Sequence, residues 1–191
     1  MSTTEVSKEF MSPLGGGFDT RNVQDKYKWW EQDKIVEDLD LTRSEFVTVC
    51  MNLDGDFNLS SLVRNSAWFN NHSVWIVGRK KWDRRGAVGT QNYMDIQYRL
   101  EPLDAIAELK ANGFTVVGAE ISDDSIELQH YKFPQRVAVI FGEEGLGLSQ
   151  EIMDACDAIV SIPGRGSVRS LNVANTGGIF LWEYHRQNYF D

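Results

Sequence analysis

Short runs of consecutive apolar residues recur along the chain and are separated by segments with a different periodicity. Each run is rich in Val, Ile and Phe, which is typical of strands that are buried on both faces of a sheet. The runs that predict strands are residues 46–50, 74–77, 114–117, 137–141 and 158–162.

The segments between these runs carry apolar residues at the spacing of one helix face. In the most N-terminal segment, Val23, Tyr27 and Trp30 fall at i, i+4 and i+7. Gly113 is placed to end a later helix, and Ser149 is placed to begin a short one. The segments that predict helices are residues 21–40, 58–70, 102–112, 149–156 and 170–188.

Apolar strands that alternate with helices are typical of an α/β fold, so we expect a mostly parallel sheet covered by helices on both faces. Such sheets bind ligands at the carboxyl ends of their strands, which makes the glycine-rich segments after the last two predicted strands the candidate site. Residues 1–20 are expected to form a flexible tail. Residues 21–45 are expected to form a helical extension that packs on the domain built by 46–191, an interpretation we favour over a dimer cap or a substrate contact.

Composition is that of a soluble globular chain. Its 191 residues are 42% hydrophobic and 25% charged, which suits one domain with its own core. The start of the chain lacks a basic segment followed by an apolar run, so we expect no signal peptide, and no stretch approaches the ~18 apolar residues of a membrane span. Cys50 and Cys156 have no paired spacing, which favours a reducing cytoplasm over a disulfide framework or a zinc site.

The net charge of −9 argues against nucleic acid as a partner, yet one segment is strongly basic. Such a run is usually a solvated surface, but in an otherwise acidic chain it favours contact with an RNA backbone. Trp82, within the run, is a candidate for stacking on an exposed base. The cations of this basic cluster are Arg79, Lys80, Lys81, Arg84 and Arg85.

The segment F-G-E-E-G-L-G-L-S, residues 141–149, places three glycines after a predicted strand. Glycine lets a ligand approach the backbone closely. The order G-x-x-G-x-G is neither the G-x-G-x-x-G of a dinucleotide fold nor a P-loop, so NAD and ATP are disfavoured. Taken alone, the segment is as consistent with an ordinary turn as with a binding loop.

Two further segments place polar residues near the starts of predicted helices. Residues 161–173 read S-I-P-G-R-G-S-V-R-S-L-N-V, in which Ser170 is a candidate N-cap. Arg165 and Arg169 of this loop are equally consistent with phosphate contacts and with solvated charges. Asn58 and Arg64, six residues apart, are by themselves typical of an N-cap and a surface arginine.

Together and in this order, the three segments resemble the motifs of the SpoU-type, or TrmH-type, RNA ribose methyltransferases of the SPOUT superfamily. The resemblance covers about residues 46–188, and its third motif is the most specific. Residues 174–178 depart from the more apolar small-residue run of relatives, which puts the packing of the last helix or of a dimer in question. The matched positions are Asn58 and Arg64, then Gly142, Glu144, Gly147 and Leu148, then Ile162, Pro163, Ser170, Leu171, Asn172 and Val173.

The resemblance implies a C-terminal trefoil knot, a homodimer with its site at the subunit interface, and S-adenosyl-L-methionine (AdoMet) held in the knot largely by backbone groups. It implies no metal, and the three histidines of the chain are scattered without metal-binding spacing. The cofactor-binding residues that it implies are Ala119, Gly142, Gly147, Leu148, Ile162, Ser170 and Leu171.

The implied reaction transfers a methyl group from AdoMet to a ribose 2'-hydroxyl. Arg64 is expected to orient that hydroxyl or the adjacent phosphate, with support from Asn58 and Ser170. Glu144 and Asn172 are expected to hold the loops and the arginine in place, although each supporting role is also consistent with a structural one.

The implied substrate is RNA, with tRNA favoured over rRNA. Arg165, Arg169 and the basic cluster are the expected RNA contacts. Two alternatives stay open, a catalytically silent RNA-binding protein of the same fold and a SPOUT enzyme that methylates a base.

Overall fold

The chain folds around a parallel sheet, and the computed structural model describes residues 19–52, 58–143 and 145–190. Within these ranges the sheet has seven strands in the order β3-β2-β1-β6-β4-β7-β5, and each neighbouring pair is parallel. The strands are β1 Ser44–Asn52, β2 Asn71–Gly78, β3 Ile96–Arg99, β4 Thr115–Ala119, β5 Ile126–Glu127, β6 Val137–Phe141 and β7 Ala158–Ser161.

Five of these strands confirm the prediction from the apolar runs, namely β1, β2, β4, β6 and β7. The sequence did not predict β3 and β5, which are the two outer strands of the sheet. Residues of β3 are only half-buried and those of β5 are exposed, so neither strand needs a continuous apolar run.

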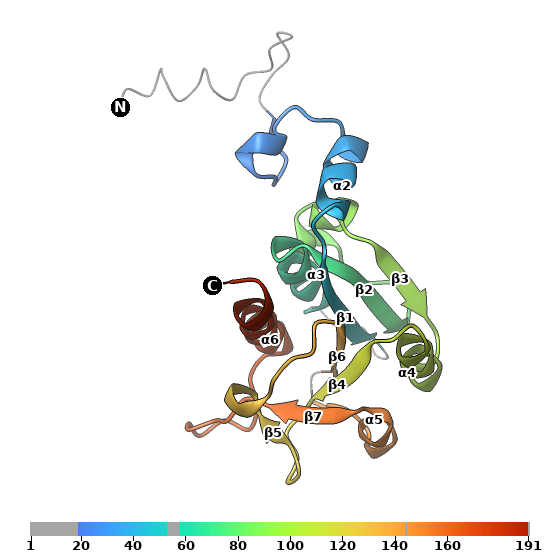
Figure 1. Ribbon diagram of the computed structural model, residues 1–191, viewed down its shortest axis with the longest axis vertical. Helices are drawn as coiled ribbons and strands as arrows, with labels where there is room; N and C mark the ends of the chain where they lie inside the picture. Colours follow the sequence, from blue (N-terminus) through green and yellow to red (C-terminus); the bar gives the residue numbers. More distant parts are fainter. Residues whose placement is uncertain (1–18, 53–57, 144, 191) are drawn as a thin grey trace.

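Helices cover both faces of the sheet, as Figure 1 shows. One face carries α3 Leu59–Trp68 and α6 Val173–Asn188, and the other carries α4 Pro102–Ala111 and α5 Gln150–Ala155. The expected fold class, α/β with a parallel sheet covered on both faces, is therefore confirmed. In the described ranges, no helix combines the length and the apolar character that crossing a membrane requires.

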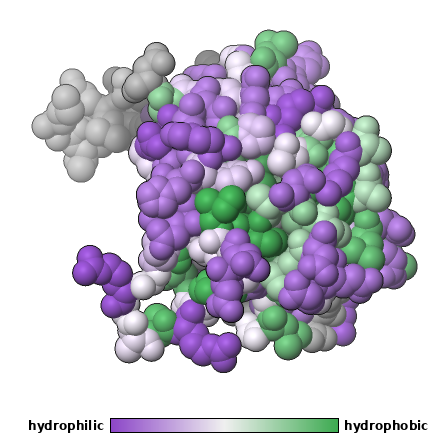
Figure 2. All heavy atoms as spheres, turned by 60° about the horizontal axis from the view of Figure 1, so that its bottom comes forward, coloured by the Kyte–Doolittle hydropathy of each residue, from purple (hydrophilic) through white to green (hydrophobic). Residues whose placement is uncertain are grey.

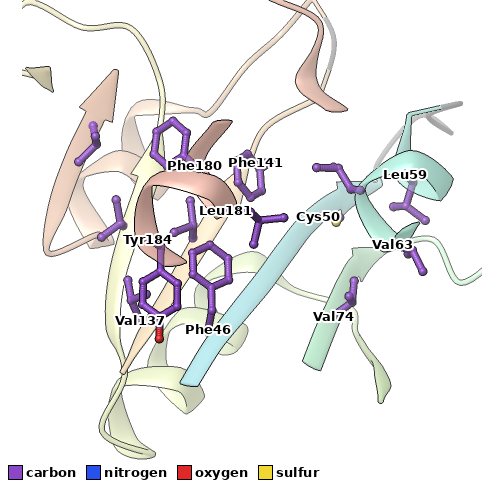
Figure 3. Packing of buried hydrophobic residues seen from close by; sticks show 14 of the residues in the cluster. Phe46, Cys50, Leu59, Val63, Val74, Val137, Phe141, Phe180, Leu181 and Tyr184 are labelled. Carbon is purple, nitrogen blue, oxygen red and sulfur yellow. The ribbon is translucent and has the colours of Figure 1, made fainter. Parts of the chain in front are cut away.

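The larger part of the core lies between the sheet and the helices α3 and α6. Figure 3 shows Phe180, Leu181 and Tyr184 of α6 against side chains of β1 and β6. The rings of Phe141 and Phe180 meet edge to face, with centroids 5.8 Å apart. Because buried aromatic side chains contribute most of the apolar area of a core, these contacts fix α6 on the sheet.

Helix α6 also packs closely on α3, at Gly177. This glycine is buried, and a Cβ at its position would collide with Leu62 Cδ2 of α3. The departure of residues 174–178 from the family pattern therefore lies where a glycine lets the two helices approach each other. Asn65 of α3 adds a hydrogen bond from Nδ2 to the Ala174 carbonyl, 3.0 Å long.

The helix expected over residues 21–40 is interrupted. The structure has a 3-10 turn, η1 Asp25–Tyr27, followed by α2 Gln32–Asp40. Trp29, between them, has a φ of 69°, a left-handed conformation with which a right-handed helix cannot continue. Its backbone N–H donates to Asp19 Oδ2 at 2.9 Å. Trp30 is 42% exposed, so the apolar face that was expected to include it does not form.

The N-terminal segment rests on the sheet domain through a small apolar cluster. Tyr27 and Ile35 are buried there together with Tyr93, which belongs to the 3-10 turn η3 Thr90–Tyr93. Of the tail expected over residues 1–20, residues 1–18 lie outside the described part of the chain. Two further 3-10 turns are η2 Arg85–Ala87 and η4 Leu128–His130.

Candidate functional site

A pocket of about 680 Å³ opens at the carboxyl ends of β4, β6 and β7. This is the edge at which parallel α/β sheets bind ligands, and the volume suits a small molecule. Phe141 and Phe180 form an apolar part of the lining. Figure 2 brings the β5 and β7 end of the molecule forward and shows hydrophobic surface near the centre of this face, between hydrophilic side chains. The loops that follow the three strands supply most of the remaining lining.

The loop after β6 folds back on itself. Gly142 and Gly147 both line the pocket, and their backbones are so close that a Cβ on Gly142 would collide with Gly147. The Gly147 N–H donates to the Glu143 carbonyl at 3.0 Å. Leu148 does not line the pocket, because its side chain is buried in the core with α4 and α5. Glu144, predicted to hold this loop, lies outside the described residues.

The short helix after this loop begins as the sequence predicts. Ser149 is the N-cap of α5, and its side chain accepts a hydrogen bond from the Ile152 backbone N–H. The cap ends the glycine-rich loop and directs the chain away from the pocket.

The loop between β7 and α6 forms another wall of the pocket. Ile162, Ser170 and Leu171 line it, together with Arg169. Arg165 of the same loop is exposed and is not part of the lining. The structure thus brings the predicted cofactor positions of the third motif to the same cavity as the glycine loop.

Helix α6 begins at Val173, and its N-cap is Asn172 rather than Ser170. Asn172 Oδ1 accepts hydrogen bonds from the backbone N–H groups of Ala174, at 3.0 Å, and Asn175, at 3.3 Å. The interpretation of Ser170 as the N-cap is therefore wrong. The side chain of Ser170 is exposed and lies at the pocket. The first N–H groups of a helix have no partner within it, and here the side chain of Asn172, two residues later, accepts from them.

The first motif meets the third through Asn58. Asn172 Nδ2 donates to Asn58 Oδ1 at 2.8 Å. Asn58 occupies the N-cap position of α3, but its side chain does not cap the helix. Arg64, on α3, is exposed, does not line the pocket, and makes no hydrogen bond or ion pair to any described residue.

The basic cluster follows β2, at the same edge of the sheet as the pocket. All five cations are exposed. Arg85 pairs with Asp83 at 2.6 Å, and Arg84 lies over the Trp82 ring at 5.6 Å from its centroid. Trp82 itself packs against the core, and its indole N–H donates to Tyr98 Oη at 3.3 Å. Trp82 therefore links the basic cluster to the core, and stacking of its ring on a base stays a prediction.

Glu120 is a pocket residue that the sequence did not predict. Glu120 directly follows Ala119 at the end of β4, and both line the pocket. The Glu120 carboxylate accepts hydrogen bonds from the Leu148 N–H at 2.7 Å and the Ile121 N–H at 2.9 Å. Its position one residue past an apolar strand was the available signal, since strand ends carry the ligand contacts in this fold class.

The described part of the chain contains no group of three or more His, Cys, Asp or Glu side chains that could hold a metal ion. His72, His130 and His185 are not brought together in the structure.

Comparison with known proteins adds to this geometry. The sequence model described as the SpoU rRNA Methylase family matches residues 45–182. A relative named "tRNA (guanosine(18)-2'-O)-methyltransferase TARBP1", from Mus musculus, is 30% identical over 184 residues. That alignment covers 87% of this chain and 12% of the mouse protein, so the chain corresponds to a small part of that relative.

Two solved structures resemble this one. The Aquifex aeolicus TrmH/SpoU tRNA modifying enzyme has a TM-score of 0.73 and 25% identity, with 82% of this chain and 81% of that chain covered. The SpoU methyltransferase AviRb from Streptomyces viridochromogenes, solved in complex with the cofactor AdoMet, has a TM-score of 0.65 and 25% identity, with 76% and 59% covered.

Residues of the second and third matched motifs line one cavity, Asn58 of the first motif bonds to Asn172 in its wall, and the family match spans most of the sheet domain. The chain belongs to the SpoU rRNA Methylase family.

Proposed function

We propose that this protein transfers a methyl group from AdoMet to a ribose 2'-hydroxyl of RNA, with tRNA favoured over rRNA. The observation that carries the proposal is the hydrogen bond between Asn172 and Asn58, which joins the third motif to the first beside the pocket lined by the second. Membership of the SpoU family supports the reaction, and the names of the mouse relative and the Aquifex aeolicus enzyme support tRNA.

The pocket fits a molecule such as AdoMet. It offers the apolar surface of Phe141 and Phe180 beside the close-packed backbone of the glycine loop, a combination that suits an adenine ring held by backbone donors and acceptors. AdoMet supplies a methyl group on a positively charged sulfur. The residues proposed to hold it are Ala119, Gly142, Gly147, Ile162, Ser170 and Leu171, while a contact of the core residue Leu148 with the cofactor stays a prediction.

The residues of this chain orient the nucleophile. A ribose hydroxyl must lose its proton as it attacks, so it has to be fixed in position and its developing charge has to be balanced. Arg64 carries out this role in our proposal, because a guanidinium is cationic at neutral pH and donates in a fixed fork to hydroxyl or phosphate oxygens. Asn58 and Ser170 support it, and Asn172 ties α6 to the first motif. The role of Glu144 stays a prediction.

We also propose a homodimer. Arg64 does not line the pocket of its own chain, so an active site at a subunit interface can bring it to the cavity of a second copy. Exposed apolar side chains on α3 and α6 support such an interface, among them Trp68, Ile179 and Trp182. A C-terminal trefoil knot, implied by the resemblance to the SPOUT superfamily, belongs to the same proposal.

RNA is proposed to lie along the carboxyl edge of the sheet. The basic cluster and Arg165 are exposed there, and Arg169 lines the pocket. Phosphate contacts by Lys and Arg position a nucleic acid without reading its sequence, which suits this set of flexible cations. The cytoplasm is the proposed location, supported by Cys50 and Cys156 being free thiols.

The test is methyl transfer from labelled AdoMet to bulk tRNA and to rRNA, with the Arg64→Ala variant alongside and the RNA digested to nucleosides. We expect label in a 2'-O-methylnucleoside from tRNA, and a loss of at least about 100-fold in the variant. Label in a methylated base would contradict the ribose assignment. AdoMet binding without transfer to either RNA would favour the silent RNA-binding alternative.

A further inference from the structure

Glu120 places a carboxylate at the edge of the pocket. It follows β4 directly, and its backbone N–H donates to the Val160 carbonyl of β7 at 3.2 Å, so its position is fixed by the sheet. Its Oε2 accepts from the Leu148 N–H at 2.7 Å, and its Oε1 accepts from the Ile121 N–H at 2.9 Å. One side chain therefore ties the glycine loop after β6 to the end of β4.

The glycine loop is shaped to receive this carboxylate. Gly147 has a φ of 66°, and a Cβ at that position would collide with Glu120 Oε2. The carboxylate thus occupies the space that a larger residue at position 147 would need. Because the Gly147 backbone lines the pocket, the contact also fixes the surface that a ligand meets.

The described lining of the pocket includes ionisable side chains of both signs. Among the described side chains that line it, the ionisable ones are Glu120, Glu143 and Arg169, two acids against one base. AdoMet carries a positively charged sulfur that its product, S-adenosyl-L-homocysteine, has lost. A carboxylate at this edge lowers the energy of the charged donor relative to the neutral sulfide, since the attraction is weakly screened where protein surrounds the charges.

We propose that Glu120 is a positioning and selectivity residue of the cofactor pocket: it holds the glycine loop in its binding shape, and its charge favours the cationic methyl donor over the neutral product. This inference rests on the proposed function, because it requires AdoMet to bind in this pocket. It assigns Glu120 no contact with the RNA and no proton transfer.

The experiment is calorimetric titration of the full chain with AdoMet and with S-adenosyl-L-homocysteine separately. The variants are Glu120→Gln, which keeps the shape and one acceptor oxygen without the charge, and Glu120→Ala, which removes both. Glu151→Gln is the matched control, because it removes an exposed carboxylate in the first turn of α5 that does not line the pocket. Thermal unfolding of each variant checks that it is folded.

We expect Glu120→Gln to weaken AdoMet binding about five-fold and to change binding of the product less than two-fold, roughly what one partly screened charge contributes. Glu120→Ala should weaken both ligands about ten-fold, as the loop loses two hydrogen bonds. Glu151→Gln should change neither.

Equal effects of Glu120→Gln on both ligands, or none on either, would overturn the selectivity. Unchanged binding by a folded Glu120→Ala variant would overturn the positioning role. If the unmodified protein bound neither ligand, the proposed function would fail and this inference with it. Binding of AdoMet that is insensitive to both variants would leave the proposed function standing and reject this inference alone.

Discussion

Asn172 Nδ2 donates a hydrogen bond to Asn58 Oδ1 across 2.8 Å, although the two residues are 114 positions apart in the sequence. At the same time Asn172 Oδ1 accepts from two N–H groups at the start of α6. One amide therefore uses its oxygen to begin a helix and its nitrogen to hold the start of another, α3. Asn172 therefore both stabilises the fold and lines the candidate site.

Replacing Asn172 separates these two uses. Asn172→Ala loses the cap and the link to Asn58, and we expect it to lower the free energy of unfolding by about 1–2 kcal/mol. Asn172→Asp keeps an acceptor for the helix N–H groups but has no donor for Asn58, so it should be closer to the unmodified protein in stability. Urea unfolding of both variants measures the difference. An Asp variant as unstable as the Ala variant would show that the link to Asn58, not the cap, carries the stability.

The two adjacent glycines of α6 should respond to alanine in opposite ways. Gly177→Ala puts a Cβ into buried Leu62, so we expect a destabilisation of about 1–3 kcal/mol from overpacking. At Gly178 a Cβ would lie 3.4 Å from Asn65 Nδ2, a contact that a small shift relieves. Gly178→Ala should therefore gain most of the helix propensity of alanine, about 0.5–1 kcal/mol. Thermal unfolding compares the pair, and equal shifts in Tm would contradict close packing at Gly177.

His185 should make stability depend on pH in the weakly acidic range. Its ring is buried against Phe69, with centroids 4.7 Å apart, and its Nδ1 donates to the Leu181 carbonyl at 2.8 Å. Burial lowers the pKa of this imidazole below its usual value. The unfolded chain then takes up the proton at a higher pH than the folded chain does. Its contribution to stability is accordingly complete above the unfolded pKa, about 6.5, and is lost as the pH falls below it.

We expect urea unfolding at pH 5.5 to give a free energy about 1 kcal/mol lower than at pH 7.5 because of this residue. His185→Phe cannot take up a proton, so it should reduce that difference. His130→Gln serves as a control, since His130 is exposed. A pH dependence that is identical in the unmodified protein and in His185→Phe would rule His185 out as its source.

Removing cations from the basic cluster should weaken RNA binding and leave AdoMet binding unchanged. Arg84→Ala combined with Arg85→Ala removes two charges from the basic cluster, and the slope of log K against log salt concentration should fall by about 1–2 units. Lys34→Ala combined with Arg186→Ala is a control of equal charge, because those exposed cations lie on α2 and α6, outside the basic cluster. An unchanged salt dependence in the cluster variant would exclude a phosphate contact there.

The sequence predicted the strands best where burial is complete. Residues 137–141 form β6 at the predicted bounds, because the central strand of a two-sided sheet must be apolar throughout. The outer strands β3 and β5 are not fully buried, so their residues need not be apolar and show no comparable pattern. The strand order could not be predicted, because the apolar pattern of β6 indicates a buried strand but does not indicate that its neighbours are β1 and β4.

The features that the sequence misplaced or missed depend on particular hydrogen bonds. Trp29 interrupts the N-terminal helix where the Asp19 carboxylate accepts its N–H, a contact that no helical periodicity records. Asn172 rather than Ser170 caps α6, and Glu120 reaches the glycine loop 28 positions further on. Each of these depends on hydrogen bonds whose partners the fold selects, so composition and spacing could indicate the region but not the atom.

Phe180 belongs both to the core and to the pocket, since its ring packs edge to face on Phe141 and also faces the cavity. The native state therefore offers a molecule in the cavity a surface that the unfolded chain does not have. By mass action, any molecule that fills the cavity then draws the folding equilibrium toward the native state, by an amount set by its concentration relative to its Kd. The fraction of this protein that is folded in its surroundings thus depends partly on the small molecules around it.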